Sequence, residues 1–216
     1  MPDCPGRFYD IVKRAIDLLI SMALLGLLFP VWLLVAVLIK LDSRGPVFFT
    51  NRVVGKDEVQ FNLYKFRSMR PNSGGDEDCR DVRRNFTQGR ATAVDTQGRP
   101  VYKTALVDEK RITRVGKFLR RTSWDEVPQL WNVLRGEMSL VGPRPALPYE
   151  AELYEDRHKR RFRVKPGITG LYQVSARNRV PITEMLCIDL EYVDRRSLRT
   201  DLGIIVRTPY AMFSGV

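Results

Sequence analysis

The 216-residue sequence predicts a small mixed α+β domain with short strands, preceded by an apolar helix that associates with a membrane. Residues 18–39 form a long segment without a charged side chain, which predicts the helix. Downstream, short strand-like segments are interspersed with helical patterns, which predicts the mixed domain. The composition, with 44% hydrophobic and 28% charged residues, is that of a folded protein. We therefore assign residues 1–45 to the membrane anchor and residues 46–216 to the domain.

The charge balance narrows the classes of partner. Lys and Arg number 36 against 25 Asp and Glu, giving a formal net charge of +11. Such a balance favours phosphorylated substrates, an anionic membrane surface or nucleic acid. The mean hydropathy of −0.24 and the single long apolar segment exclude a polytopic transporter. Three scattered cysteines and one histidine argue against a disulfide framework, a multi-histidine metal site and Ser-His-Asp catalysis.

The apolar segment is long enough, as a straight helix, to cross a bilayer core of about 30 Å. Pro30 lies near its middle, where proline removes a backbone hydrogen bond and kinks a helix. Basic residues flank both ends, so the positive-inside rule does not give a direction. Two interpretations stay open, a transmembrane span and a re-entrant helix that breaks at Pro30 and returns to the same face. A buried core helix is a third alternative.

Amphipathic patterns lie near both ends of the chain. A lead-in helix is predicted by apolar residues at helical spacing: Phe8, Ile11, Val12 and Ala15. A similar stripe, with arginines around it, occurs near the C-terminus: Leu198, Leu202, Ile205 and Val206. This C-terminal helix could lie in the membrane interface or pack onto the domain.

The polar part reads as strands first and helices later. Residues 47–49 and 59–63 predict a hairpin that turns at 55–57, and residues 71–100 predict a long loop. Val127, Leu130, Trp131 and Leu134 predict a helix that Gly136 ends. Further elements are a charged helix over 151–163, a turn over 165–170, a strand over 171–174 and a helix over 183–193.

Two adjacent acids, Asp125 and Glu126, are the leading candidates for chemistry. Ser123 and Glu126 fit a capping box, which places both acids in the first turn of a helix, where the helix dipole favours anions. One carboxylate could attack phosphorus and the other could hold Mg²⁺. The alternative is that the two acids only cap the helix.

Basic residues around these acids suit phosphate binding. They comprise Lys65, Arg67, Arg120 and Arg144, the last of which lies between two prolines that restrict its backbone. Lys165 precedes a Gly- and Thr-containing segment that could cradle an anion. For each of these residues the alternative is a solvated basic surface.

Three strings occur in order behind the proline-containing apolar segment: KFRSM at 65–69, RRTSWDEVPQLWNVLRGEMSLVGPRP at 120–145 and KPGITGLYQVSARN at 165–178. In this respect the chain resembles the monotopic phosphoglycosyl transferases of the bacterial sugar transferase family. The resemblance implies transfer of a sugar-1-phosphate from a UDP-sugar to undecaprenyl phosphate, with release of UMP. It implies a first membrane step in exopolysaccharide, lipopolysaccharide or other glycoconjugate synthesis. It also places the domain on the cytoplasmic face of the bacterial inner membrane, anchored by a re-entrant helix broken at Pro30.

The resemblance also implies roles for single residues. Asp125 would form a phosphosugar-aspartyl intermediate, and Glu126, with Asp125, would bind Mg²⁺. The substrate- and phosphate-binding residues would be Lys65, Arg67, Arg120, Arg144, Lys165, Thr169, Gln173, Arg177 and Asp189. The partners would be the UDP-sugar, undecaprenyl phosphate and the bilayer, without nucleic acid. The sugar is left open, and so is the oligomeric state, a homo-oligomer included.

One alternative function belongs to another class, a membrane-anchored basic protein that binds nucleic acid without catalysis. The net charge of +11 is its support. Against it, the sequence contains no recognisable DNA- or RNA-binding motif, and its aromatic residues fall in apolar stripes instead of among the arginines.

Overall fold

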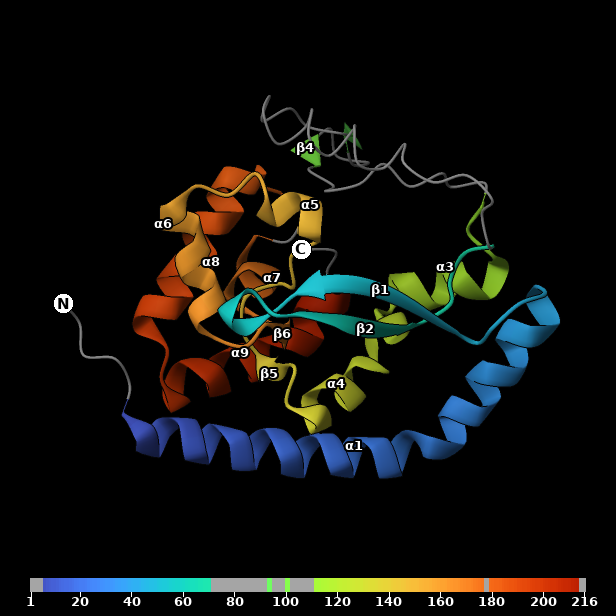
Figure 1. Cartoon of the computed structure of the whole chain (residues 1–216). Coiled ribbons are helices and arrows are strands. Elements are labelled where there is room, and N and C mark those ends of the chain that lie inside the picture. The colour runs from blue at the N-terminus through green and yellow to red at the C-terminus, as the bar shows by residue number, and fades with distance from the viewer. Residues whose placement is uncertain (1–5, 71–92, 95–99, 102–110, 177–178, 214–216) are drawn as a thin grey trace.

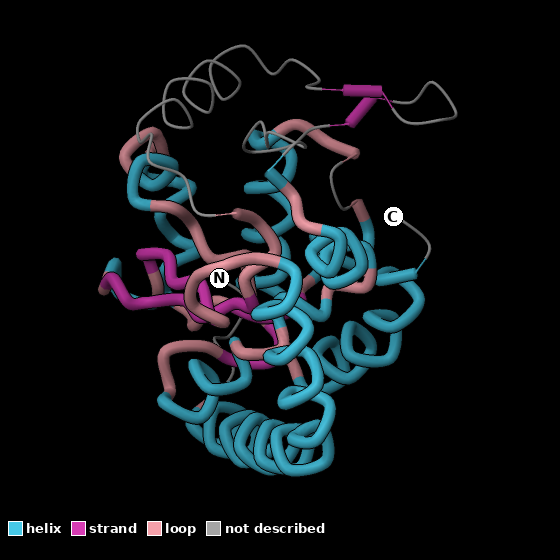
Figure 2. The backbone as a smooth tube through the Cα atoms, turned by 90° about the vertical axis from the view of Figure 1, so that its right-hand side faces the viewer, coloured by secondary structure: helices cyan, strands magenta, loops and turns pink. Residues whose placement is uncertain are grey.

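The computed structural model describes residues 6–70, 93–94, 100–101, 111–176 and 179–213. The long helix α1 (Arg7–Asp42) runs along the base of the molecule, and the other described elements lie to one side of it (Figures 1 and 2). Most of the loop predicted over 71–100 falls outside the described residues. Two short strands at its far end, β3 (Ala93–Val94) and β4 (Pro100–Val101), pair antiparallel.

Helix α1 turns a polar stripe towards the domain and apolar side chains away from it. Tyr9, Lys13, Asp17 and Ser21 recur every fourth residue, and we call them the α1 polar stripe. The Tyr9 hydroxyl donates to Asp201 Oδ2 at 2.9 Å, and Asp17 Oδ1 accepts from the Leu140 N–H at 3.0 Å. The large apolar side chains of α1 that are more than half exposed are Phe8, Ile11, Leu19, Met22, Leu27, Phe29, Leu33, Leu34, Val37 and Leu41.

The exposure of α1 excludes one of the three interpretations of the apolar segment, the buried core helix. Within the most apolar part of α1 only 11% of the residues are buried, so α1 is not a core helix. Among the described residues α1 is the one helix long and apolar enough to cross a membrane. The predicted lead-in helix is confirmed as its first turns.

Pro30 bends α1 without ending it. The helix continues through this residue, and Figure 1 shows its last turns rising from the base towards the start of β1. Pro30 is the one proline inside α1, and proline is the usual cause of such a kink. The structure therefore has a bend, not an interruption, and the re-entrant course in a bilayer stays a prediction.

The predicted hairpin is confirmed and is longer than expected. Strand β1 (Phe48–Val54) pairs antiparallel with β2 (Gln60–Phe66), and the register sets Phe49 opposite Lys65. The connection is a 3-10 turn, η1 (Lys56–Glu58), with Asp57 and Glu58 at positive φ.

Three elements follow that carry or support the two candidate acids. Helix α3 (Arg114–Arg121) starts at Thr113, whose Oγ1 accepts from the Gly116 N–H at 3.0 Å. A Cβ at Gly116 would lie 1.9 Å from the Ser68 carbonyl oxygen, so this glycine lets α3 sit directly on the chain after β2. A 3-10 turn, η3 (Trp124–Glu126), leads to α4 (Gln129–Arg135). As predicted, α4 ends at Gly136, whose φ is 82°.

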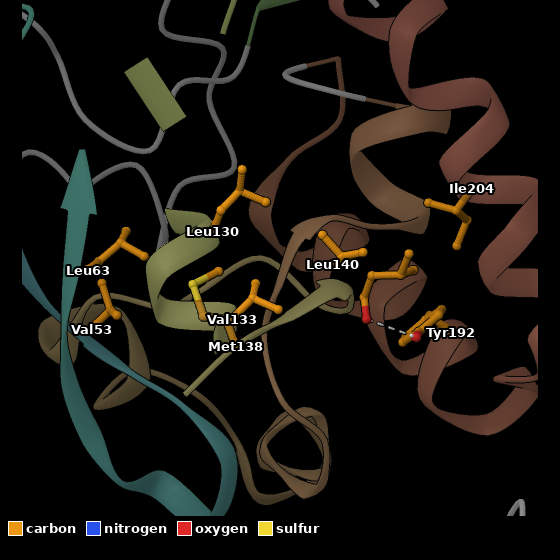
Figure 3. Packing of buried hydrophobic residues seen from close by; sticks show 9 residues of the cluster. Val53, Leu63, Leu130, Val133, Met138, Leu140, Tyr192 and Ile204 are labelled. Atoms are coloured by element: carbon orange, nitrogen blue, oxygen red, sulfur yellow. Dashed lines mark hydrogen bonds between the residues drawn. The ribbon is translucent and has the colours of Figure 1, made fainter. Parts of the chain in front are cut away.

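The main core forms where the hairpin, α4 and the C-terminal helices meet around a short parallel pair of strands. Strand β5 (Ser139–Val141) pairs with β6 (Gly167–Thr169). Figure 3 shows buried side chains of this core: Val53, Leu63, Leu130, Val133, Met138, Leu140, Tyr192 and Ile204. The dashed line marks the Tyr192 hydroxyl donating to the Val141 carbonyl oxygen at 3.2 Å.

Two local predictions are wrong around β6. The segment predicted as a turn, 165–170, contains β6, and the predicted strand over 171–174 is a helix, α7 (Leu171–Ser175). The glycines of this segment allow two stretches of backbone to approach each other closely, besides allowing turns. A Cβ at Gly167 would lie 2.1 Å from the Gly142 nitrogen. Four residues were too few to distinguish a strand from a helix by their period.

The prediction of a single charged helix over 151–163 is also wrong. The chain forms α5 (Pro148–Ala151), α6 (Asp156–Lys159) and a 3-10 turn, η4 (Arg160–Arg163). Glu150 and Arg161 are both buried, and their tertiary contacts override the local helical preference.

The last two helices confirm the predictions for the C-terminal part. Helix α8 (Ile182–Arg195) covers the predicted helix over 183–193, and α9 (Leu198–Phe213) covers the apolar stripe. Ile204 of α9 packs in the core, whereas Leu202, Val206 and Tyr210 are largely exposed on another face. Packing onto the domain is thus confirmed for one face of α9, and contact of the other face with the membrane interface stays a prediction.

Candidate functional site

Asp125 and Glu126, which we call the dyad, lie on the η3 turn between α3 and α4. The predicted capping box is wrong, because Ser123 caps no helix with its side chain and adopts a left-handed conformation at φ 55° and ψ 19°. That conformation in a non-glycine residue costs about 1–3 kcal/mol and occurs most often at functional sites. It turns the chain sharply after α3, so the dyad occupies a turn of its own ahead of α4.

The dyad turn rests on the last part of α1. Trp124 packs against a buried cluster formed by Val35 and Ile39 of α1, Phe66 of β2 and Leu119 of α3. The long apolar helix α1 is therefore part of the support of the two acids. A change in the direction of α1 would be transmitted to them through Trp124.

Two cations act on the dyad. Lys65 Nζ lies 2.8 Å from Glu126 Oε1, with both side chains about one third exposed (30% and 33%). Burial, followed by the adjacent charge of Glu126, raises the pKa of Asp125 to about 6, while Lys65 and Arg120 act in the opposite direction. Asp125 is accordingly a carboxylate at neutral pH, poorly solvated and held next to positive charge. Such a group is suited to attack an electrophilic phosphorus atom.

Asn132 fixes α4, and with it the dyad turn, to the hairpin. Its amide nitrogen donates to the Asn62 carbonyl at 2.8 Å and to Glu137 Oε2 at 2.7 Å, and its amide oxygen accepts from the Tyr64 N–H at 3.1 Å. Sequence analysis missed this residue. The available signal was a polar side chain within the apolar pattern of residues 127–134.

Arg144 and Asp189 belong to a second cluster. Arg144 Nη1 lies 3.2 Å from Glu150 Oε2, and Arg161 donates to the Arg144 carbonyl oxygen at 2.6 Å. Arg161 also pairs with Asp189, with both side chains 1% exposed, and donates to the Tyr154 hydroxyl at 3.0 Å. Asp189 thus supports the Arg144 loop from inside the protein. Sequence analysis missed Glu150 and Arg161, which no motif marked.

Arg67 is placed away from the dyad. It is buried and donates to the carbonyl oxygens of Ile39, Ser43 and Arg44, at 3.3, 2.7 and 2.9 Å. The Ile39 carbonyl lies in the last turn of α1 and the other two follow directly after the helix, at a helix C-terminus, where a cation is favourable. We therefore leave Arg67 out of the phosphate-binding group and assign it to the junction between α1 and the hairpin.

The other predicted residues are dispersed. Lys165 lies near Gly136, at the end of α4 away from the dyad, and burial together with Arg14 lowers the pKa of its ammonium group. Thr169 Oγ1 lies 2.8 Å from Thr208 Oγ1 and ties β6 to α9. The Gln173 Oε1 atom is buried without a hydrogen-bond partner among the described residues. Arg177 lies outside the described residues.

The dyad could take part in holding a divalent cation, although the protein supplies few ligands. The described residues contain no group of three or more His, Cys, Asp or Glu side chains placed for a metal ion. Mg²⁺ commonly takes one or two carboxylates from a protein and its other ligands from substrate phosphates and water. Two adjacent carboxylates, of which Glu126 raises the pKa of Asp125, fit that mode of binding.

The family model described as bacterial sugar transferase matches residues 8–215. The chain belongs to this family. It is 40% identical over 198 residues to the exopolysaccharide production protein ExoY of Sinorhizobium fredii, a match that covers 92% of this chain and 84% of that protein. It is 41% identical over 197 residues to the UDP-galactose-lipid carrier transferase of Erwinia amylovora, which covers 91% of this chain and 39% of that protein.

A third relative is the UDP-glucose:undecaprenyl-phosphate glucose-1-phosphate transferase of Xanthomonas campestris, 40% identical over 210 residues. This match covers 93% of the chain and 38% of the relative. The chain therefore spans most of the length of ExoY and about two fifths of the other two. Membership of the bacterial sugar transferase family confirms the resemblance, and the comparisons give no support to the nucleic-acid-binding alternative.

Proposed function

We propose that this chain transfers a sugar-1-phosphate from a UDP-sugar to undecaprenyl phosphate and releases UMP. The observation that carries the proposal is the partly buried Asp125, whose pKa is raised to about 6, beside Glu126, Lys65 and Arg120. The names of the relatives support the substrate classes, since they include a UDP-galactose-lipid carrier transferase and a UDP-glucose:undecaprenyl-phosphate transferase.

In the first step an Asp125 carboxylate oxygen attacks the β-phosphorus of the UDP-sugar. A P–O bond to aspartate forms, and the bond from that phosphorus to the bridging oxygen breaks. UMP leaves with the electron pair of the bridging oxygen, and the phosphosugar stays on Asp125. This assignment uses the carboxylate as the attacking group, as in other aspartyl-phosphate enzymes.

In the second step a phosphate oxygen of undecaprenyl phosphate attacks the same phosphorus. The P–O bond to Asp125 breaks, so the carboxylate is regenerated and the lipid carries a diphosphate-linked sugar. The two steps form a ping-pong cycle. A single aspartate serves both, first as nucleophile and then as leaving group.

Basic residues orient the phosphates during these steps. Lys65 and Arg120 already act on the charge of Asp125 and are placed to share their charge with the donor. Arg144 contributes from a loop that Glu150 and Arg161 hold in place. Glu126 and Asp125 would hold Mg²⁺, which when bound would offset the negative charge of the diphosphate.

The contacts of α1 with the domain support a re-entrant course of this helix in the membrane. Near its start Lys13 Nζ lies 2.7 Å from Asp201 Oδ2, and in its last turn the Ile39 carbonyl oxygen accepts from Arg67 at 3.3 Å. Both ends are therefore fixed to one domain, which supports a helix that enters the bilayer and stays on one side. The exposed apolar side chains of α1 and α9 would contact lipid, with the domain at the cytoplasmic face of the inner membrane.

A panel of UDP-sugars tests the proposal directly. The full chain in detergent, with undecaprenyl phosphate and Mg²⁺, is expected to release UMP from at least one member, with UDP-glucose and UDP-galactose tested first. These two sugars come first because the relatives name both. No UMP release with any UDP-sugar, from protein whose fold is verified by circular dichroism, would contradict the proposed activity.

The donor half-reaction is expected to slow as the pH falls through about 6, because protonated Asp125 cannot attack. Below that pH the rate should drop about tenfold per pH unit. Single-turnover UMP release without polyprenol is the measurement, since it excludes titration of the acceptor phosphate. Lys65→Met should move the midpoint to higher pH by removing a cation, whereas Lys159→Met should not. A rate that is constant between about pH 5 and 8 would contradict the role of Asp125 as nucleophile.

Glu126→Gln is expected to weaken the dependence of the rate on Mg²⁺. The substitution removes one of two carboxylate ligands while keeping the shape of the side chain. The measurement is a Mg²⁺ titration of UMP release, in which the half-saturating concentration should rise by about tenfold or more. Glu152→Gln, on the α5 side of the molecule, is the matched control. An unchanged titration would refute the metal role of Glu126.

Pro30→Ala is expected to straighten α1, since alanine restores the backbone hydrogen bond that proline lacks. Single cysteines placed near the start and end of α1 would be labelled from each side of sealed vesicles. In the parent protein both positions should react from the same side, and in the variant part of the population should react from opposite sides. Opposite-side labelling of the parent would instead support a transmembrane span.

A further inference from the structure

A cationic recess lies at the C-terminal end of α1, beside the junction with the hairpin. It has a volume of about 620 Å³, and we call it the α1 recess. Among the residues that the structure describes, its lining consists of Lys40, Leu41, Asp42, Ser43, Arg44 and Arg70. Three of these side chains are cationic and one is anionic, so the lining carries a net charge of +2.

The backbone that carries these cations is fixed by hydrogen bonds. The Arg44 carbonyl oxygen accepts from Arg67 at 2.9 Å. The Arg70 N–H donates to the Arg111 carbonyl at 2.9 Å, and the Arg70 carbonyl accepts from Arg111 at 3.3 Å. The one acid, Asp42, accepts from the Val115 N–H at 2.7 Å and so serves the start of α3. None of the three cations forms an ion pair with another residue that the structure describes.

An apolar stripe leads along α1 into the recess. Leu34, Val37, Leu38 and Leu41 follow helical spacing and are all exposed, Leu41 to 79%. Leu41 is both the end of this stripe and part of the lining of the recess. A ligand that fits the two together has a hydrocarbon tail and an anionic head.

We propose that the α1 recess binds a phosphate group carried by a lipid. The guanidinium groups of Arg44 and Arg70 match phosphate oxygens in geometry, and the Lys40 ammonium adds charge. The lipid is either an anionic phospholipid of the bilayer or a polyprenyl phosphate, which share this chemistry. With a phospholipid in the recess the proposal goes beyond the transfer reaction, whereas with a polyprenyl phosphate it rests on the proposed function and names where the acceptor's phosphate binds.

Lipid binding is measured on the full chain in neutral detergent by native mass spectrometry. The probes are dioleoyl phosphatidylglycerol, undecaprenyl phosphate and inorganic phosphate, each titrated alone. The triple variant Lys40→Gln, Arg44→Gln, Arg70→Gln should bind the lipids more weakly, by about 5-fold for each charge and so by about 100-fold in all. The triple variant Arg157→Gln, Lys159→Gln, Arg195→Gln loses the same charge at exposed positions on α6 and α8 and should bind as the parent does.

Each outcome has a definite meaning. Recess-dependent binding of phosphatidylglycerol, of undecaprenyl phosphate or of both supports the site and identifies the source of the phosphate. An equal loss of lipid affinity in the two triple variants would show that binding depends only on the overall charge of the protein, and would overturn the proposal. Binding of inorganic phosphate as tight as that of the lipids would also overturn it, because the apolar stripe would then contribute nothing. A folded parent that binds lipid but releases no UMP would contradict the proposed function alone.

Discussion

Asp125→Asn is expected to abolish UMP release while leaving the protein folded and membrane-bound. Asparagine keeps the size of the side chain but cannot form the acyl phosphate, so the covalent route is closed. The loss should be about 10⁴-fold or more, as for removal of other nucleophiles. Radiometric or luminescent detection of UMP, alongside membrane flotation of the same preparation, makes the comparison.

Two controls make this result specific. Asp156→Asn applies the same chemical change to a fully exposed side chain on α6 and should leave the rate unchanged. Intact-mass analysis of the parent, held with donor but without polyprenol, should show the mass of one phosphosugar, and the variant should show none. Substantial turnover by Asp125→Asn, or kinetics that require both substrates bound together, would exclude the aspartyl intermediate.

Asp189→Asn is expected to lower the free energy of unfolding by about 3–5 kcal/mol. Asp189 and Arg161 are each 1% exposed, so removing the carboxylate leaves a buried guanidinium without its counter-charge. The measurement is urea-induced unfolding in detergent, followed by circular dichroism. Activity should fall as well, because Arg161 also holds the Arg144 carbonyl oxygen.

The matched control lies on the same helix. Asp194 of α8 pairs with Arg160, but these side chains are 39% and 43% exposed. Asp194→Asn should therefore cost less than about 1 kcal/mol, since solvent screens an exposed pair. Arg161→Met combined with Asp189→Leu should recover part of the stability by replacing the ion pair with apolar packing. A loss from Asp189→Asn no larger than that from Asp194→Asn would show that the buried pair is unimportant.

Periodicity along the chain was enough to predict the elements that bury one apolar face. Helices α4, α8 and α9 follow this rule, and Gly136 ends α4 as expected. Helix α1 was predicted from the hydrophobicity of residues 18–39 and from helical spacing in its first turns. Its inward polar stripe was not predicted, because the polar partners, such as Asp201, are distant in sequence.

Single local motifs predicted the site less well than the three ordered sequence strings at 65–69, 120–145 and 165–178 did. Ser123 and Glu126 have capping-box spacing, yet the left-handed Ser123 turns the chain and serves the dyad instead. The sequence correctly associated Lys65 and Arg120 with Asp125. It also grouped Arg67 with these residues, because Arg67 is close to Lys65 in the sequence. In the structure the Arg67 side chain instead binds backbone carbonyls at the end of α1. Buried pairs such as Arg161 and Asp189 depend on three-dimensional packing, which no spacing rule encodes.

The hydrogen bond from Tyr9 to Asp201 joins residues 192 positions apart, and this has a consequence for biosynthesis. Translation completes α1 long before α9 exists. Until then Tyr9 and Lys13 lack their carboxylate partner, so the domain cannot close over the nascent chain. The contact between α1 and α9 is therefore a long-range one that can form only late in folding, after both helices have been synthesised.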